Sequence, residues 1–333
     1  MPTPSVKDCF VVLDRDSLLD LIEKAIKTEG PLCNLNDLDV SKISDFRGIF
    51  FDSPFMGTIS KWDMSSATRL DGMFEKSKFN GDISKWNVSN VTDMHGLFWG
   101  SKFDGDVSAW NVGKVINMNN VFDRSPFKGD LSKWNVSNAV TMFSMFADSP
   151  FDSDISKWDV SNVQDFSYMF ASAIFQGDIS KWNTSSALSM SCMFAGSAYR
   201  HHLSNISSWN VTNVQNFSDM FNAADGPRDL SAWQFSRLAN VTNILMQGNL
   251  SEYDKPSTYH WLIAMLERKL DFLRPKERAF LDKNELICAT LCETTLDAAR
   301  MTQHAWLQEQ ALHVAPMDTI ALPQLDVPDG IGF

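Results

Sequence analysis

The sequence predicts an α/β repeat solenoid, a stack of about nine 24-residue coils with a helical cap at each end. Three observations lead to this prediction. A tryptophan recurs every 24 residues, whole segments recur with it, and helical patterns precede and follow the repeats. The tryptophan series consists of Trp62, Trp86, Trp110, Trp134, Trp158 and Trp182, then Trp209 after 27 residues and Trp233 after another 24.

Each unit divides into two halves. The first half, such as I-S-K-W-N-V-S-N-V at 83–91, has apolar residues at the L-x-x-L-x-L offsets of leucine-rich repeats, with an Asn following. Alternation along a short strand puts Trp86 and Val88 on one face. The apolar residues of 91–98 have helical or 3₁₀ spacing, which predicts an opposite wall that also points inward. We therefore expect the tryptophans of successive coils to pack against one another in a shared core.

The limits of the array follow from the same register. Leu38 occupies the tryptophan position 24 residues before Trp62, so the array is expected to span residues 32–250. At ~4.8 Å between adjacent strands, the stack should be on the order of 40 Å long. Glycines recur within the units, and we expect each to form a tight corner with positive φ. They are Gly57, Gly81, Gly105, Gly129 and Gly177.

The string G-D-I-S-K-W-N-V-S-N-V-T-D-M at 81–94 resembles the BspA-type leucine-rich repeat of bacterial surface proteins and lipoproteins. Near-copies of it extend the resemblance over about two-thirds of the chain. The resemblance implies a solenoid that binds proteins or mediates adhesion. It implies no catalytic residues.

The segments outside the array predict caps and a tail. Residues 1–31 are expected to form an N-terminal cap of a strand and a helix, the helix covering 16–29 with Asp16 or Ser17 as its N-cap. Residues 251–315 are expected to be helical, either as a cap for the last coil or as an effector or oligomerisation module. Residues 316–333, with their prolines, predict an extended tail.

Composition excludes several classes of function. The net charge of −12 argues against non-specific binding to nucleic acid and to anionic membranes. We expect no membrane insertion, because no stretch approaches the ~20 apolar residues of a membrane span. The start lacks the pattern of a signal peptide, and five cysteines give no disulfide framework. These features predict a cytoplasmic protein, or one secreted without a recognisable signal peptide.

The candidate partner-binding face is the expected concave side of the solenoid, where polar residues recur in register. Stacked amides there are expected to form hydrogen bonds from coil to coil. The alternative is a solvated face whose charge only maintains solubility. An insertion of three residues in the seventh unit adds two histidines to the candidates. The face consists of Lys61, Asp63, Lys85, Asn87, Asn111, Lys133, Asn135, Lys157, Asp159, Lys181, Asn183, His201 and His202.

The sequence contains no recognised catalytic motif, and we expect no catalytic residue, no cofactor and no metal. Cys288 and Cys292 are expected to share a helical face and could form half of a metal site, but no second pair exists, so buried structural thiols are favoured. The predicted function is a non-enzymatic, protein-binding solenoid, bacterial in origin, with an unknown partner and oligomeric state. One alternative is a secreted or injected bacterial effector that acts through its C-terminal helices. The other is a surface adhesin.

Overall fold

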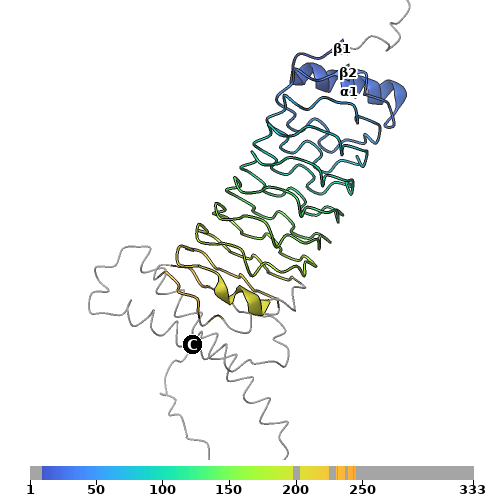
Figure 1. Ribbon diagram of the computed structural model, residues 1–333. Helices are drawn as coiled ribbons and strands as arrows, with labels where there is room; N and C mark the ends of the chain where they lie inside the picture. Colours follow the sequence, from blue (N-terminus) through green and yellow to red (C-terminus); the bar gives the residue numbers. More distant parts are fainter. Residues whose placement is uncertain are drawn as a thin grey trace, which may run out of the picture.

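The computed structural model describes residues 10–197, 203–224, 230, 232–236, 239–242 and 244. In this part of the chain, successive coils stack on one another along a common axis (Figure 1). Parallel bridges join one residue of each coil to its equivalent in the next coil. The bridged residues are Asp45, Arg69, Asp93, Asn117, Thr141, Asp165, Ser189, Asn216 and Asn240. The chain is therefore a repeat protein with a period of 24 residues, and the step of 27 residues between Ser189 and Asn216 leaves the stacking intact.

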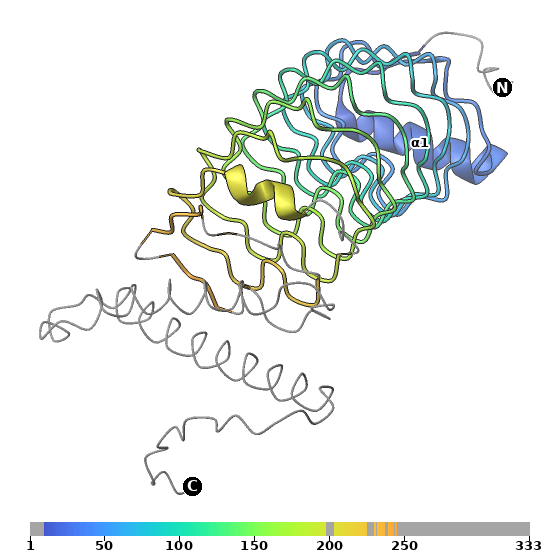
Figure 2. The same ribbon diagram turned by 60° about the horizontal axis from the view of Figure 1, so that its bottom comes forward.

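One end of the stack is covered by helix α1 (Arg15–Glu29), as Figure 2 shows. Strand β1 (Phe10–Val11) pairs in parallel with strand β2 (Leu38–Asp39) of the first coil. The helix buries Leu18 and Ile22 in the common core. Its N-cap is Asp14, whose carboxylate accepts the Ser17 N–H at 2.8 Å. The predicted helix is thus confirmed, but Asp16 or Ser17 as its cap was wrong, because the side chain able to reach that N–H stands earlier in the chain.

The core is a set of aromatic columns that run along the stack. Each tryptophan of the 24-residue series is only 3–4% exposed, which confirms that the indoles point inward. Rings of neighbouring coils lie nearly parallel in four pairs of the described series, for example Trp62 and Trp86 with centroids 6.4 Å apart and planes 4° apart. A phenylalanine column beside them has centroids 5.4–5.9 Å apart, beginning with Phe50 and Phe74. Because each ring is covered by its neighbours, no single coil could bury its own aromatic residues.

Each indole also ties its coil to the preceding one through a hydrogen bond. Trp134 Nε1 donates to the Val107 carbonyl at 3.0 Å, and Trp110 Nε1 donates to the Ile83 carbonyl at the same distance. The same bond recurs at every tryptophan of the series. The buried N–H is therefore satisfied, as a buried indole requires.

The outer surface has two walls, and both differ from the elements expected. The tryptophan wall, residues 82–90 and their equivalents, consists of turns rather than a short strand, although Trp86 and Val88 are both buried. The ladder wall, residues 93–100 and their equivalents, carries the bridged residue of each coil and then consecutive turns in place of a helix. The spacing of apolar residues indicates only which side chains face inward. Tight turns can produce the same inward-facing pattern as a helix, so the spacing does not determine the backbone conformation.

The ladder wall has polarised hydrogen bonds. In coil 79–102, the N–H groups of residues 94, 96, 98 and 100 all donate to carbonyls of the following coil. The intervening N–H groups of residues 97, 99 and 101 donate to carbonyls three residues earlier in the same coil. At alternate positions of this wall, the peptide dipoles therefore point the same way along the stack. At the first coil, whose carbonyls have no preceding coil, the Arg15 side chain of α1 donates to the Arg47 carbonyl at 2.8 Å.

Left-handed backbone occurs at two ladder positions per coil, such as Gly96 and Gly100, both with φ of 61°. The glycines expected to have positive φ are not among these positions, so that prediction was wrong. They lie close to neighbouring atoms instead. A Cβ on Gly129 would lie 2.6 Å from Phe127 Cζ, and one on Gly57 would lie 1.9 Å from the Cys33 carbonyl oxygen.

The three-residue insertion leaves the stacking of the described coils on either side of it intact. The 3₁₀ helix η1 (Leu203–Ser208) follows it, with Ile206 buried, and Trp182 still stacks on Trp209 at 6.5 Å. His201 and His202 lie outside the described residues. The expected C-terminal helices, the extended tail, and Cys288 with Cys292 lie outside them too.

Candidate functional site

The predicted candidates on the tryptophan wall are exposed. In the described part of the stack, the lysine column, which comprises Lys61, Lys85, Lys133, Lys157 and Lys181, makes no ion pair within 4 Å. Hydrogen bonds from Ser84, Ser132 and Ser156 lower the pKa values of Asp82, Asp130 and Asp154, and the neighbouring lysines of the column act in the same direction. Between Lys157 and Lys181 the surface has an open hollow of about 560 Å³, which Asp154 and Asp178 also line. The lysines are therefore accessible, and none of them is held by an ion pair.

The Asn and Asp candidates have a local role. The Asn87 side-chain oxygen accepts the N–H of Ser89 two residues later, an Asx turn that Asn135 makes with Ser137. The equivalent turn recurs at the remaining candidates of this column. The expected amide bonds from coil to coil come from another column. Asn90, for example, donates to the Ser65 carbonyl of the preceding coil at 2.8 Å, and its equivalents are Asn138, Asn162 and Asn213.

The ladder wall, in contrast, presents different residues in each coil. The tryptophan wall repeats D-I-S-K-W-N-V-S-N with few changes, whereas the outward positions of the ladder wall vary much more from coil to coil. One such column has Phe51, Glu75, Trp99 and Asp123 in its first part, then alanines in three successive coils, then Asn222. This change from large to small side chains hollows the surface.

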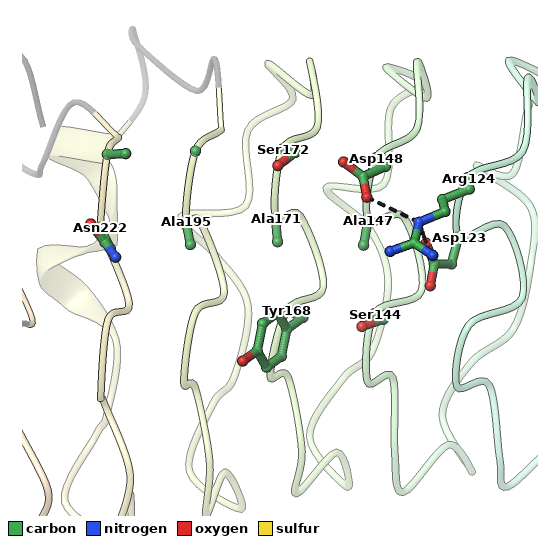
Figure 3. A pocket seen from close by; sticks show the side chains of 12 residues that line it. Asp123, Arg124, Ser144, Ala147, Asp148, Tyr168, Ala171, Ser172, Ala195 and Asn222 are labelled. Atoms are coloured by element: carbon green, nitrogen blue, oxygen red, sulfur yellow. Dashed lines mark hydrogen bonds and ion pairs between the residues drawn. The ribbon is translucent and has the colours of Figure 1, made fainter.

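The resulting alanine groove runs across several coils and has a volume of about 400 Å³ (Figure 3). We define it by its floor of Ala147, Ala171 and Ala195, by Asp123 and Arg124 at one end, and by Tyr168 beside the floor. The groove was not predicted from the sequence, because it arises from residues that differ between units rather than from those that recur. Comparing the same column from coil to coil would have revealed the alanines.

Asp123 is the unusual group of the groove. The residue is 6% exposed, and its Oδ2 accepts a hydrogen bond from Asn120 Nδ2 at 2.9 Å. Its Oδ1 is buried and makes no hydrogen bond, and Arg124 Nε lies 3.8 Å from it. Burial raises the pKa of the Asp123 carboxyl above its ordinary value. An unsatisfied buried acceptor of this kind is unfavourable in a native structure.

Arg124 is held loosely. Its side chain is 63% exposed, and Nε donates to Asp148 Oδ2 at 3.3 Å across to the next coil (Figure 3). Exposed ion pairs of this sort contribute little, about 0–1 kcal/mol. Two carboxylates and one guanidinium therefore give this end of the groove a net negative charge.

Tyr168 stands at a costly position. Its φ is +59°, in the left-handed column where the first three coils have glycine, and bulky residues seldom adopt this conformation. The ring is partly exposed and lies 5.5 Å from that of Phe143. A hydrogen bond to the Cys192 sulfur raises the pKa of Tyr168, and burial raises the pKa of the Cys192 thiol.

Other kinds of site find no support in the described ranges. No group of three or more His, Cys, Asp or Glu side chains there could hold a metal ion. Among the same residues, no helix is long and apolar enough to span a bilayer.

The fold defines a repeat protein. A family model described as "Mycoplasma protein of unknown function, DUF285" matches residues 20–127, 100–198 and 151–259. These overlapping matches cover more than half of the chain, and the chain belongs to this family. No curated protein and no solved structure matches it. The BspA-type resemblance and the leucine-rich-repeat-like fold class remain predictions.

Proposed function

We propose that the chain is a non-enzymatic, leucine-rich-repeat-like scaffold that binds a polypeptide partner on its ladder wall. The observation that carries this proposal is the contrast between the two walls. The tryptophan wall repeats residues that build the stack, whereas the ladder wall varies at exposed positions and contains the alanine groove. The stacked architecture does not require the exposed residues of the ladder wall to differ between coils. Specific binding of a partner does require such differences.

The aromatic columns support the proposal on energetic grounds. A surface carried by stacked, buried rings is already ordered before a partner arrives, so little conformational entropy is lost on binding. The lysine column is the competing surface. Its side chains are long and exposed, so they would contribute mainly long-range attraction to an acidic partner.

Affinity capture with the full chain, followed by mass spectrometry, tests the proposal. A captured polypeptide is then purified and its affinity is measured for three variants. Ala171→Trp fills the groove, Lys133→Glu alters the tryptophan wall, and Ile116→Trp adds an indole at an exposed position outside the groove. We expect only Ala171→Trp to abolish binding. Capture of no polypeptide would refute the function, and a loss confined to Lys133→Glu would refute the choice of wall.

A further inference from the structure

We infer that the alanine groove binds an extended polypeptide segment through a lysine or arginine side chain that pairs with Asp123 and Asp148. The inference rests on the proposed function and specifies the chemistry of its partner. Two independent observations carry it. They are the buried carboxylate oxygen without a hydrogen bond and the partly exposed tyrosine held at a left-handed backbone position.

The floor of the groove determines the shape of the occupant. Ala147, Ala171 and Ala195 occupy one column of three adjacent coils, and Gly196 follows in the neighbouring column. Small side chains let a second backbone approach closely. From Asp123 to Asn222 the groove crosses five coils, which at ~4.8 Å per coil is about 19 Å. An extended chain at ~3.3 Å per residue covers this length with about six residues.

Charge determines the chemistry of that segment. Asp123 Oδ1 lacks a donor, and Asp148 shares the single Arg124 guanidinium with it. The Arg124 side chain is mostly exposed and is held by one hydrogen bond of 3.3 Å. It can therefore turn aside at small cost and leave both carboxylates to an incoming cation. The net charge of −12 on the chain favours the approach of a basic segment as well.

Tyr168 provides the second contact. Its ring lies beside the alanine floor in Figure 3 and is supported by Phe143 at 5.5 Å. Tyr168 and Asp148 belong to adjacent coils and lie on opposite sides of the alanine floor, so a lysine or arginine stem that crosses the floor packs its apolar part near the ring while its charge extends to the carboxylate. The backbone cost of a tyrosine at φ of +59° is compatible with a role in recognition.

The test is selection of a phage-displayed random hexapeptide library on the full chain. We expect the selected peptides to share a lysine or arginine at one fixed position. A selected peptide, synthesised with a fluorescent label, should bind Asp123→Asn at least about tenfold more weakly than wild type and should not bind Ala171→Trp. Ile116→Trp should bind it as wild type does.

Stability measurements separate recognition from folding. Asp123→Asn removes a buried charge without changing shape, so its melting temperature should equal or exceed that of wild type while peptide affinity falls. Selection of acidic peptides, selection of no peptide, or equal affinity for Asp123→Asn and wild type would each overturn the inference. If Ala171→Trp still blocked a captured protein partner in those cases, the proposed function would stand without it.

Discussion

Replacing Trp134 with alanine should destabilise the protein by about 4 kcal/mol. Trp134 is 3% exposed, so the substitution removes almost a whole indole from the core. A buried tryptophan hides ~150–250 Å², which corresponds to about 4–6 kcal/mol at ~25 cal/mol per Å². That figure is an upper bound, because unfolded chains already bury some apolar surface, and measured Trp→Ala costs are about 3–5 kcal/mol.

A second variant separates the ring from the hydrogen bond. Trp134→Phe keeps an aromatic ring on Phe122, whose centroid is 6.0 Å away, but loses the indole N–H bond to the Val107 carbonyl. That carbonyl still accepts the Trp110 backbone N–H at 3.1 Å. Trp134→Phe should therefore cost only about 1–2 kcal/mol.

Urea unfolding followed by tryptophan fluorescence measures these differences, since seven tryptophans of the series remain in each variant. Trp99→Ala is the matched control, because Trp99 is outside the series, partly exposed, and contacts Lys76 Nζ with its ring at 5.1 Å. It should cost about 1 kcal/mol or less. If Trp134→Ala cost no more than Trp99→Ala, the stacked indoles would not be the main source of stability.

Three further predictions concern other parts of the molecule. Gly129→Ala should lower the free energy of unfolding in urea by about 1–3 kcal/mol, because its Cβ would lie 2.6 Å from Phe127 Cζ. The control Gly113→Ser introduces the serine found at this position in the neighbouring coils, and it should change stability by less than about 0.5 kcal/mol. Asp14→Ala should cost about 1 kcal/mol through loss of the N-cap, and the exposed Asp20→Ala should not; equal effects in thermal melts would contradict the cap. The melting temperature should be nearly constant down to about pH 4, the unfolded carboxyl pKa, and fall below it as the lower folded pKa values are reached. In the folded protein, hydrogen bonds from serine backbone N–H groups lower the pKa values of four carboxyls, those of Asp82, Asp106, Asp130 and Asp154. A melting temperature that rises from pH 5 to pH 3 would contradict the stabilising role of these hydrogen bonds.

The tryptophan spacing was sufficient to predict which residues face inward. Apolar residues that recur at fixed positions can be buried together only if the coils stack, so the core of Trp86, Val88 and their equivalents followed from the sequence. The backbone conformation did not follow. Whether residues 91–98 form a helix or a ladder depends on donors and acceptors in adjacent coils, which spacing within one unit does not report. A recurring glycine is similarly ambiguous, because close approach and positive φ both require it.

The candidate site was predictable only in part. The exposed lysine column follows from alternation around Trp86, but the neighbouring Asn87 looked like a bonding group between coils and instead closes its own turn with Ser89. Asx turns are local, and the spacing of an acceptor and an N–H two residues later was visible in the sequence. The alanine groove depends on differences between units, so the repeat consensus does not reveal it.

The polarised ladder gives the two ends of the stack different requirements. Because the ladder N–H groups point toward the following coil, the first coil is left with carbonyls and apolar surface to cover. Helix α1 meets both needs, with Leu18 and Ile22 in the core and Arg15 donating to the Arg47 carbonyl. A cationic donor suits this end, since aligned carbonyls carry partial negative charge as they do at a helix C-terminus. By the same reasoning, the N–H groups that point away from α1 need acceptors, so a helix such as α1 with a cationic donor would not suit the opposite end of such a stack.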